Sequence, residues 1–72
     1  MNRVMRENLE GQIRIVAGSR LEIETVLRDL AEGWEHLGND RQARRVRVAL
    51  EELRSGSGVV RAGHSEYRVT DP

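Results

Sequence analysis

Arginine is the residue type in this sequence with the clearest capacity for recognition chemistry. All twelve basic residues are arginine, and Arg41, Arg44, Arg45 and Arg47 crowd into one short stretch. A guanidinium group donates paired hydrogen bonds from a planar fork, which matches the geometry of carboxylate and phosphate groups. This stretch is therefore the first candidate for a binding surface.

Two of these arginines have an acidic residue at helical spacing. Asp40 precedes Arg44 by four positions and Glu51 follows Arg47 by four, so both can form ion pairs along a helix. The other two have no such neighbour, and they lie near the helix start, where the macrodipole disfavours cations. On a helical wheel a valine projects between them. The outer face of this helix is expected to hold Arg41, Arg44, Arg45 and Val48.

This face has three alternative roles. It can be solvated, or paired with Glu32 and Glu35 across a helical hairpin; it can contact a partner protein or a second copy; or it can contact phosphates. Exposed ion pairs contribute only about 0–1 kcal/mol each, so pairing alone is a weak reason for so many arginines. The predicted partner-binding residues are Arg41, Arg44, Arg45 and Val48.

The remaining polar residues do not form a catalytic or metal-binding pattern. His36 and His64 have no second ligand at metal-binding spacing. Glu51 and Glu52 are adjacent, so they diverge around a helix and cannot act as an acid/base pair. The segment 56–58 is glycine-rich but lacks the lysine of a phosphate-binding loop. We expect no enzyme, no cofactor, no metal site and no small-molecule substrate.

Composition favours one small domain that associates with another chain. With 72 residues, no cysteine and no phenylalanine, the chain can build only a small aliphatic core, and such domains are marginally stable alone. Its net charge is zero, so no overall charge draws it to nucleic acid or lipid. No apolar run is long enough for a membrane span and no secretory signal is recognisable, so we expect a cytoplasmic protein.

Two helices are predicted over 19–37 and 40–54. Ser19 and Glu22 have the spacing of a capping box, and Gly38 followed by Asn39 can end one helix and begin the next. A connection this short makes the helices antiparallel neighbours. The first apolar stripe is expected at 23, 26, 27, 30, 34 and 37, and the second at 43, 46, 49, 50 and 53.

Three strands are predicted around this helical hairpin. Residues 12–16 alternate apolar and polar side chains, and 59–62 and 66–70 flank a glycine-containing turn. Residues 1–11 form an N-terminal segment for which a short helix is favoured over a strand. The sequence thus predicts an α+β domain, with an antiparallel helical hairpin packed on a small antiparallel sheet of two or three strands.

Two residues of the first helix have open interpretations. Gly33 lies inside the helix, where glycine is less favourable than alanine by roughly 1 kcal/mol. It can mark close packing against another backbone, a break in the helix, or a hinge. Trp34 is expected in the core with its indole N–H at the rim, and its alternative role is an interface anchor.

The order of the predicted elements resembles the winged-helix DNA-binding fold. A short helix, a strand, two helices and a β-hairpin follow one another in that order. The resemblance implies that the second helix reads DNA with its first residues and that the turn at His64 is the wing tip. The nucleic-acid residues implied are Arg41, Arg44, Arg45, Arg47, Arg61, His64 and Arg68.

The unbroken first helix and the zero net charge argue against DNA binding. We therefore predict a non-enzymatic protein-interaction module that forms a homodimer, and its small size suits an accessory or inhibitory protein. DNA binding through the arginine-rich helix is the alternative. Neither hypothesis includes a membrane partner.

Overall fold

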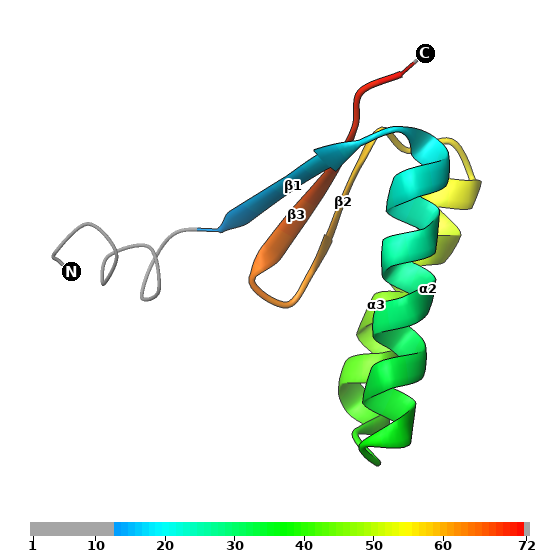
Figure 1. Ribbon diagram of the computed structural model, residues 1–72, viewed down its shortest axis with the longest axis vertical. Helices are drawn as coiled ribbons and strands as arrows, with labels where there is room; N and C mark the ends of the chain where they lie inside the picture. Colours follow the sequence, from blue (N-terminus) through cyan, green and yellow to red (C-terminus); the bar gives the residue numbers. More distant parts are fainter. Residues whose placement is uncertain (1–12, 72) are drawn as a thin grey trace, which may run out of the picture.

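The computed structural model describes residues 13–71 of the chain, and the expected N-terminal helix lies outside them. Two helices pack against one three-stranded sheet, which confirms the predicted α+β class (Figure 1). The elements in chain order are β1 (Arg14–Gly18), α2 (Arg20–His36), α3 (Asp40–Arg54), β2 (Val59–Ala62) and β3 (Ser65–Val69).

Helix α2 begins with the predicted capping box. The backbone N–H of Glu22 donates to the Ser19 hydroxyl oxygen at 3.1 Å, and the backbone N–H of Ser19 donates to the Glu22 carboxylate at 2.8 Å. Two backbone donors at the helix start are thereby satisfied. The strand β1 runs directly into this cap, so the capping box fixes where the sheet ends and the helices begin.

A tight connection folds α3 back along α2. Gly38 has a φ of 78°, the left-handed conformation that glycine adopts without strain. The Asn39 side chain then accepts a hydrogen bond from the Gln42 backbone N–H at 3.1 Å and caps α3. The two helices consequently run antiparallel and side by side, as predicted (Figure 1).

The contact between the helices is narrow and aliphatic. From α2 it buries Ile23, Leu27 and Ala31, each no more than 1% exposed, and Trp34 packs at its edge. The α3 stripe is as predicted, and its buried members are Ala43, Val46, Ala49, Leu50 and Leu53. The small alanine side chains in both helices allow the two helix axes to approach each other closely.

The expected α2 stripe was partly wrong. Val26 and Leu30 are each 37% exposed and Leu37 is 77% exposed, although all three were expected in the core. Ala31, which the pattern left out, is fully buried in their place. Because α2 turns its alanine toward α3, the neighbouring stripe of larger side chains faces outward.

The sheet is mixed, whereas the sequence predicted an antiparallel sheet. Strand β3 lies in the centre, antiparallel to β2 and parallel to β1, so the order is β1-β3-β2. The central strand is covered on both faces: Tyr67 faces the helices, and Glu66 on the other face lies beneath two arginine side chains. The edges are short strands of five and four residues.

Only one face of the sheet packs against the helices. Val60 and Tyr67 are buried there, with Ala62 and Val69 partly buried beside them, as the alternation predicted. In β1 the inward residue is Val16, and Ile15 lies on the other face, where it is 53% exposed. Within the described residues the strand begins at Arg14, and it ends later than the predicted range 12–16 because Ala17 and Gly18 continue to pair with β3.

One arginine joins the start of α2 to the end of α3. The Arg20 guanidinium donates to the carbonyl oxygen of Leu53, in the last turn of α3, at 2.9 Å and to that of Ser57 at 3.4 Å. A cation at this end of a helix also interacts favourably with the helix dipole. The Arg20 backbone N–H donates to the Asp71 carboxylate at 3.0 Å. These contacts hold the segments that lead into and out of the sheet at one end of the helices.

The helices are longer than the sheet. Figure 1 shows that the ends of α2 and α3 that meet at Gly38 continue well beyond the β2–β3 turn. This half of the helical hairpin is therefore accessible from several sides. Among the described residues, no helix has the length and apolar character needed to cross a membrane.

The core contact predicts a large difference between two leucines of α2. Leu27→Ala should lower the free energy of unfolding by about 2–5 kcal/mol, because it leaves a cavity in a fully buried site. Leu21→Ala, at a side chain that is 71% exposed, should change it by no more than about 0.5 kcal/mol. Urea unfolding followed by far-UV circular dichroism measures both values, and equal losses would contradict this packing.

Candidate functional site

The predicted arginine cluster lies on one exposed surface of α3. Arg41, Arg44, Arg45 and Val48 all project outward, and the valine side chain is 53% exposed among them. Within residues 13–71, no carboxylate lies within 4.0 Å of the first three. We call this surface, made of Arg41, Arg44, Arg45 and Val48, the arginine face.

Arg47, unlike the arginines of the arginine face, is paired with a carboxylate. Its guanidinium makes two hydrogen bonds of 2.9 Å to the two carboxylate oxygens of Glu35, across the helical hairpin. The predicted ion pair between Arg47 and Glu51 is wrong, since the Glu51 carboxylate instead lies 3.8 Å from the Arg54 guanidinium. The alternative, pairing across the helical hairpin, is confirmed for Arg47 alone. The hydrogen bond from Arg47 is the main reason that the pKa of Glu35 lies below its ordinary value.

The acidic side chains of α3 leave the arginine face open. Asp40 does not lie within ion-pair distance of Arg44, so the predicted pair is not formed among the described residues. A shallow groove of about 430 Å³ continues from Arg44 and Val48 along the helix toward Glu52 and Ser55. The face therefore combines three unneutralised guanidinium groups with an apolar centre and an adjoining depression.

The other arginines named for nucleic-acid binding are engaged in the sheet. Arg61 from β2 and Arg68 from the central strand itself both donate to the carboxylate of Glu66. Glu66 is only 7% exposed, although neither α2 nor α3 covers this face of the sheet. His64 lies at the exposed turn between β2 and β3. The residues expected to form a wing are thus largely committed to a contact within the protein.

The buried carboxylate was missed from the sequence. In the β2–β3 register Arg61 lies directly opposite Glu66, and Arg68 follows two positions later on the same face. An arginine facing a glutamate across a predicted hairpin is the signal that was available. The hydrogen bond from Arg68, supported by that from Arg61, lowers the pKa of Glu66 against the opposing effect of burial.

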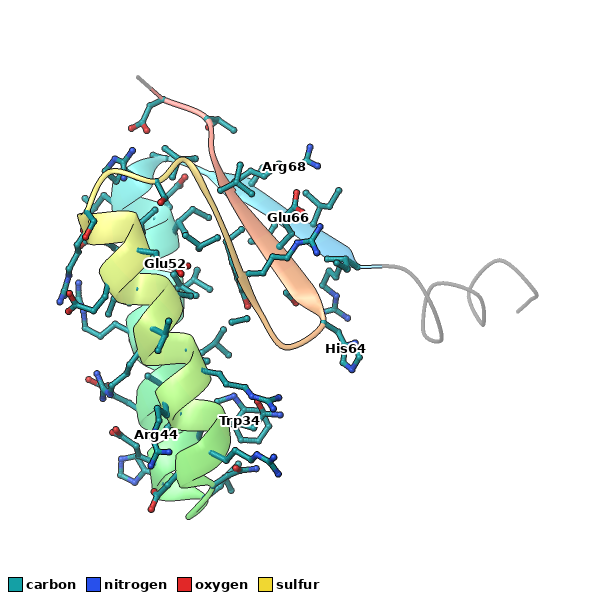
Figure 2. All side chains as sticks on the ribbon, turned by 180° about the vertical axis from the view of Figure 1, so that it is seen from behind. Trp34, Arg44, Glu52, His64, Glu66 and Arg68 are labelled. Atoms are coloured by element: carbon teal, nitrogen blue, oxygen red, sulfur yellow. The ribbon has the colours of Figure 1, made fainter. Side chains whose placement is uncertain are left out.

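A second candidate surface lies on the outward stripe of α2. It is a shallow apolar groove of about 460 Å³, which we call the α2 groove, and it is lined by Val26, Asp29, Leu30, Gly33, Trp34 and Leu37. Trp34 packs partly against the core, as predicted, and is half-buried. Figure 2 shows it on the side of the helices where the sheet lies, beyond the turn at His64.

The surroundings of Gly33 exclude two of the three roles expected for it. Helix α2 is continuous through it, so the alternative of a helix break is wrong. A Cβ atom built at Gly33 would meet no atom of the described chain within 4 Å, so the expected close packing against another backbone is wrong too. Within the described residues, the missing side chain only deepens the α2 groove.

No group of three or more potential metal ligands is assembled within residues 13–71. Comparisons of the chain with known protein families, with curated proteins and with solved structures find no match. The function must therefore be argued from these surfaces themselves.

The buried carboxylate predicts a specific dependence of stability on pH. Because the pKa of Glu66 is below its ordinary value of 4.5, its ionised form stabilises the fold above that pH, and this stabilisation is lost as the pH falls through the lowered value. Glu66→Gln should therefore lower Tm most above about pH 5 and progressively less in acid. Thermal unfolding across this range measures the difference.

The control for this experiment is Glu52→Gln. The Glu52 carboxylate is exposed and forms no ion pair with another residue of the described chain. Its variant should follow the wild-type dependence on pH. A Glu66→Gln protein with a wild-type profile would contradict the role given to the contact with Arg61 and Arg68.

Proposed function

We propose that this protein is a small non-enzymatic protein-interaction module that binds an acidic surface of a partner protein through the arginine face. The proposal includes a homodimer as the functional form and an accessory or inhibitory role. The predicted cytoplasmic location belongs to the same proposal.

The observation that supports it most is that neighbouring arginines of α3 differ in whether a carboxylate of the protein pairs with them. Arg47 is matched by a bidentate carboxylate, whereas the three arginines of the arginine face have no carboxylate within ion-pair distance among the described residues. Arginine is well suited to bidentate contacts with carboxylates of another chain and is enriched in protein interfaces. These three side chains are in position to provide such contacts.

An exposed Val48 among these arginines favours a protein partner. Interfaces between proteins combine an apolar centre with a polar rim, and Val48 with its surrounding guanidinium groups has this composition. A complementary partner surface would present an apolar side chain among aspartates or glutamates. Such a surface would gain affinity from both parts, and charge complementarity would favour encounter.

Nucleic-acid binding remains the second candidate because the same arginines suit phosphates. Three observations weigh against it. The helices lie side by side as a hairpin, whereas a helix-turn-helix crosses at a steep angle (Figure 1). Arg61 and Arg68, the arginines of the expected wing, are already paired with Glu66. A chain of zero net charge also lacks the overall basic character of most DNA-binding domains.

Replacing the arginine face should abolish partner binding without unfolding the protein. The triple variant Arg41→Ala/Arg44→Ala/Arg45→Ala should fold, since these side chains are exposed, and should lose partners that the wild type captures from nuclease-treated extract of its source cells. Binding of the wild type should weaken as salt is raised. The matched control Arg14→Ala/Arg28→Ala/Arg54→Ala removes the same charge elsewhere and should keep the partner.

A labelled DNA duplex distinguishes the two candidates in the same series. Fluorescence anisotropy at low and moderate salt should show no DNA binding by the wild type. Binding that weakens steeply with salt and is lost in the arginine-face variant would overturn the protein-partner proposal and favour DNA contact.

A further inference from the structure

We propose that the α2 groove is the self-association surface of this protein, and that a second copy docks there with its own α2 running antiparallel. This inference rests on the homodimer in the proposed function and gives it a specific interface. It leaves the arginine face free, since that face lies on α3.

The first argument is the continuous apolar surface of α2. Val26, Leu30 and Leu37 follow one another on the same side of the helix, spaced by four and seven residues, next to the partly buried Trp34. Together their side chains form an apolar stripe that the described fold leaves partly exposed. Stripes of this spacing are the pattern by which one helix packs against another.

The second argument is the glycine within that stripe. Gly33 makes the helix less stable than alanine would, and no contact within residues 13–71 requires a residue without a side chain at this position. A glycine on a helix surface allows another helix to approach closely. The groove is therefore deep enough at Gly33 to receive a side chain of another molecule. Within a single copy of the described fold, no contact benefits from this depth.

The third argument is that the stripe matches itself when it is reversed. Val26 and Leu37 are equally far from the midpoint of the stripe, and so are Leu30 and Gly33. In a symmetric antiparallel pair, each residue contacts its counterpart of the other copy at the same height. Leu30 of each copy would lie against Gly33 of the other, and Leu37 against Val26. Each contact thus joins a larger side chain to a smaller one, as close packing requires.

The charges beside the stripe are also complementary under this reversal. Asp29 and His36 lie on the solvent-exposed flank of the stripe, and both are exposed. In the antiparallel pair, Asp29 of one copy comes within about one helical turn of His36 of the other, on the same flank, and this happens twice. The imidazole can donate to the carboxylate across the edge of the contact.

The shape of the protein leaves room for this arrangement. The groove runs from Val26 toward the end of α2 that extends beyond the sheet (Figure 1). Two copies that overlap through this part of α2 place their sheets at opposite ends of the pair. The contact would cover the exposed part of Trp34, which is the single tryptophan of the chain.

Sedimentation equilibrium of the full chain tests this interface with three variants. The wild type should be a dimer at micromolar concentration. Gly33→Leu fills the α2 groove with a side chain, and Leu37→Glu places a charge in the apolar stripe. Each variant should raise the dimer Kd by at least about tenfold. Leu21→Glu introduces the same charge at a leucine of similar exposure, outside the stripe, and should leave Kd unchanged.

Folding and tryptophan fluorescence complete the experiment. Gly33→Leu should keep the wild-type circular dichroism spectrum, because a side chain at this position meets open space in the monomer. Emission from Trp34 should shift to the red on dilution of the wild type and stay constant for the monomeric variants. A monomeric wild type, or a dimer that survives both stripe variants, would overturn the proposed interface.

The outcome is separable from that of the arginine face. If the arginine-face proposal is right and the groove proposal is wrong, partner binding is lost only in the arginine variant and Kd for self-association is unaffected by Gly33→Leu. If the groove proposal alone is right, the arginine-face variant remains a dimer and wild type and variant show no difference in partner capture.

Discussion

The close contact between α2 and α3 is the constraint on which the rest of the structure depends. The chain has neither disulfides nor a large aromatic core, so the buried aliphatic residues of this contact supply most of the apolar burial. Ala31 and Ala49 keep the helices near each other, and Arg20 ties the start of one to the end of the other. The strands then follow from the helix ends, because β1 enters α2 through its cap and β2 leaves α3 after a short connection.

Local signals in the sequence were enough to predict the helices. The capping box at Ser19, the left-handed Gly38 and the cap at Asn39 act within a few residues, and each is formed as predicted. Periodicity also identified the buried stripe of α3 in full. For α2 it was only partly right, because two adjacent stripes of that helix are apolar and their spacing cannot decide which one meets α3. The small side chain of Ala31 decides it, through a contact with residues distant in sequence.

In the candidate site, too, features that depend on local sequence were predictable, and features that depend on contacts between distant residues were not. The arginine face needs only the helical period of 40–54, so its members could be named from sequence. The partner of Arg47 could not be fixed, since Glu35 reaches it only after the hairpin has formed. The parallel pairing of β1 with β3 was likewise out of reach, because it depends on which hairpin strand occupies the centre of the sheet.

The short edge strands have a consequence for how this protein avoids aggregation. An exposed edge offers unpaired N–H and C=O groups on which a foreign strand can extend the sheet, and charged side chains on short edges discourage this. Here β1 carries Arg14 and β2 carries Arg61, and neither strand exceeds five residues. The sheet is consequently a poor template for fibril growth. Short charged edges of this kind also limit pairing with a foreign strand when part of a small fold opens locally.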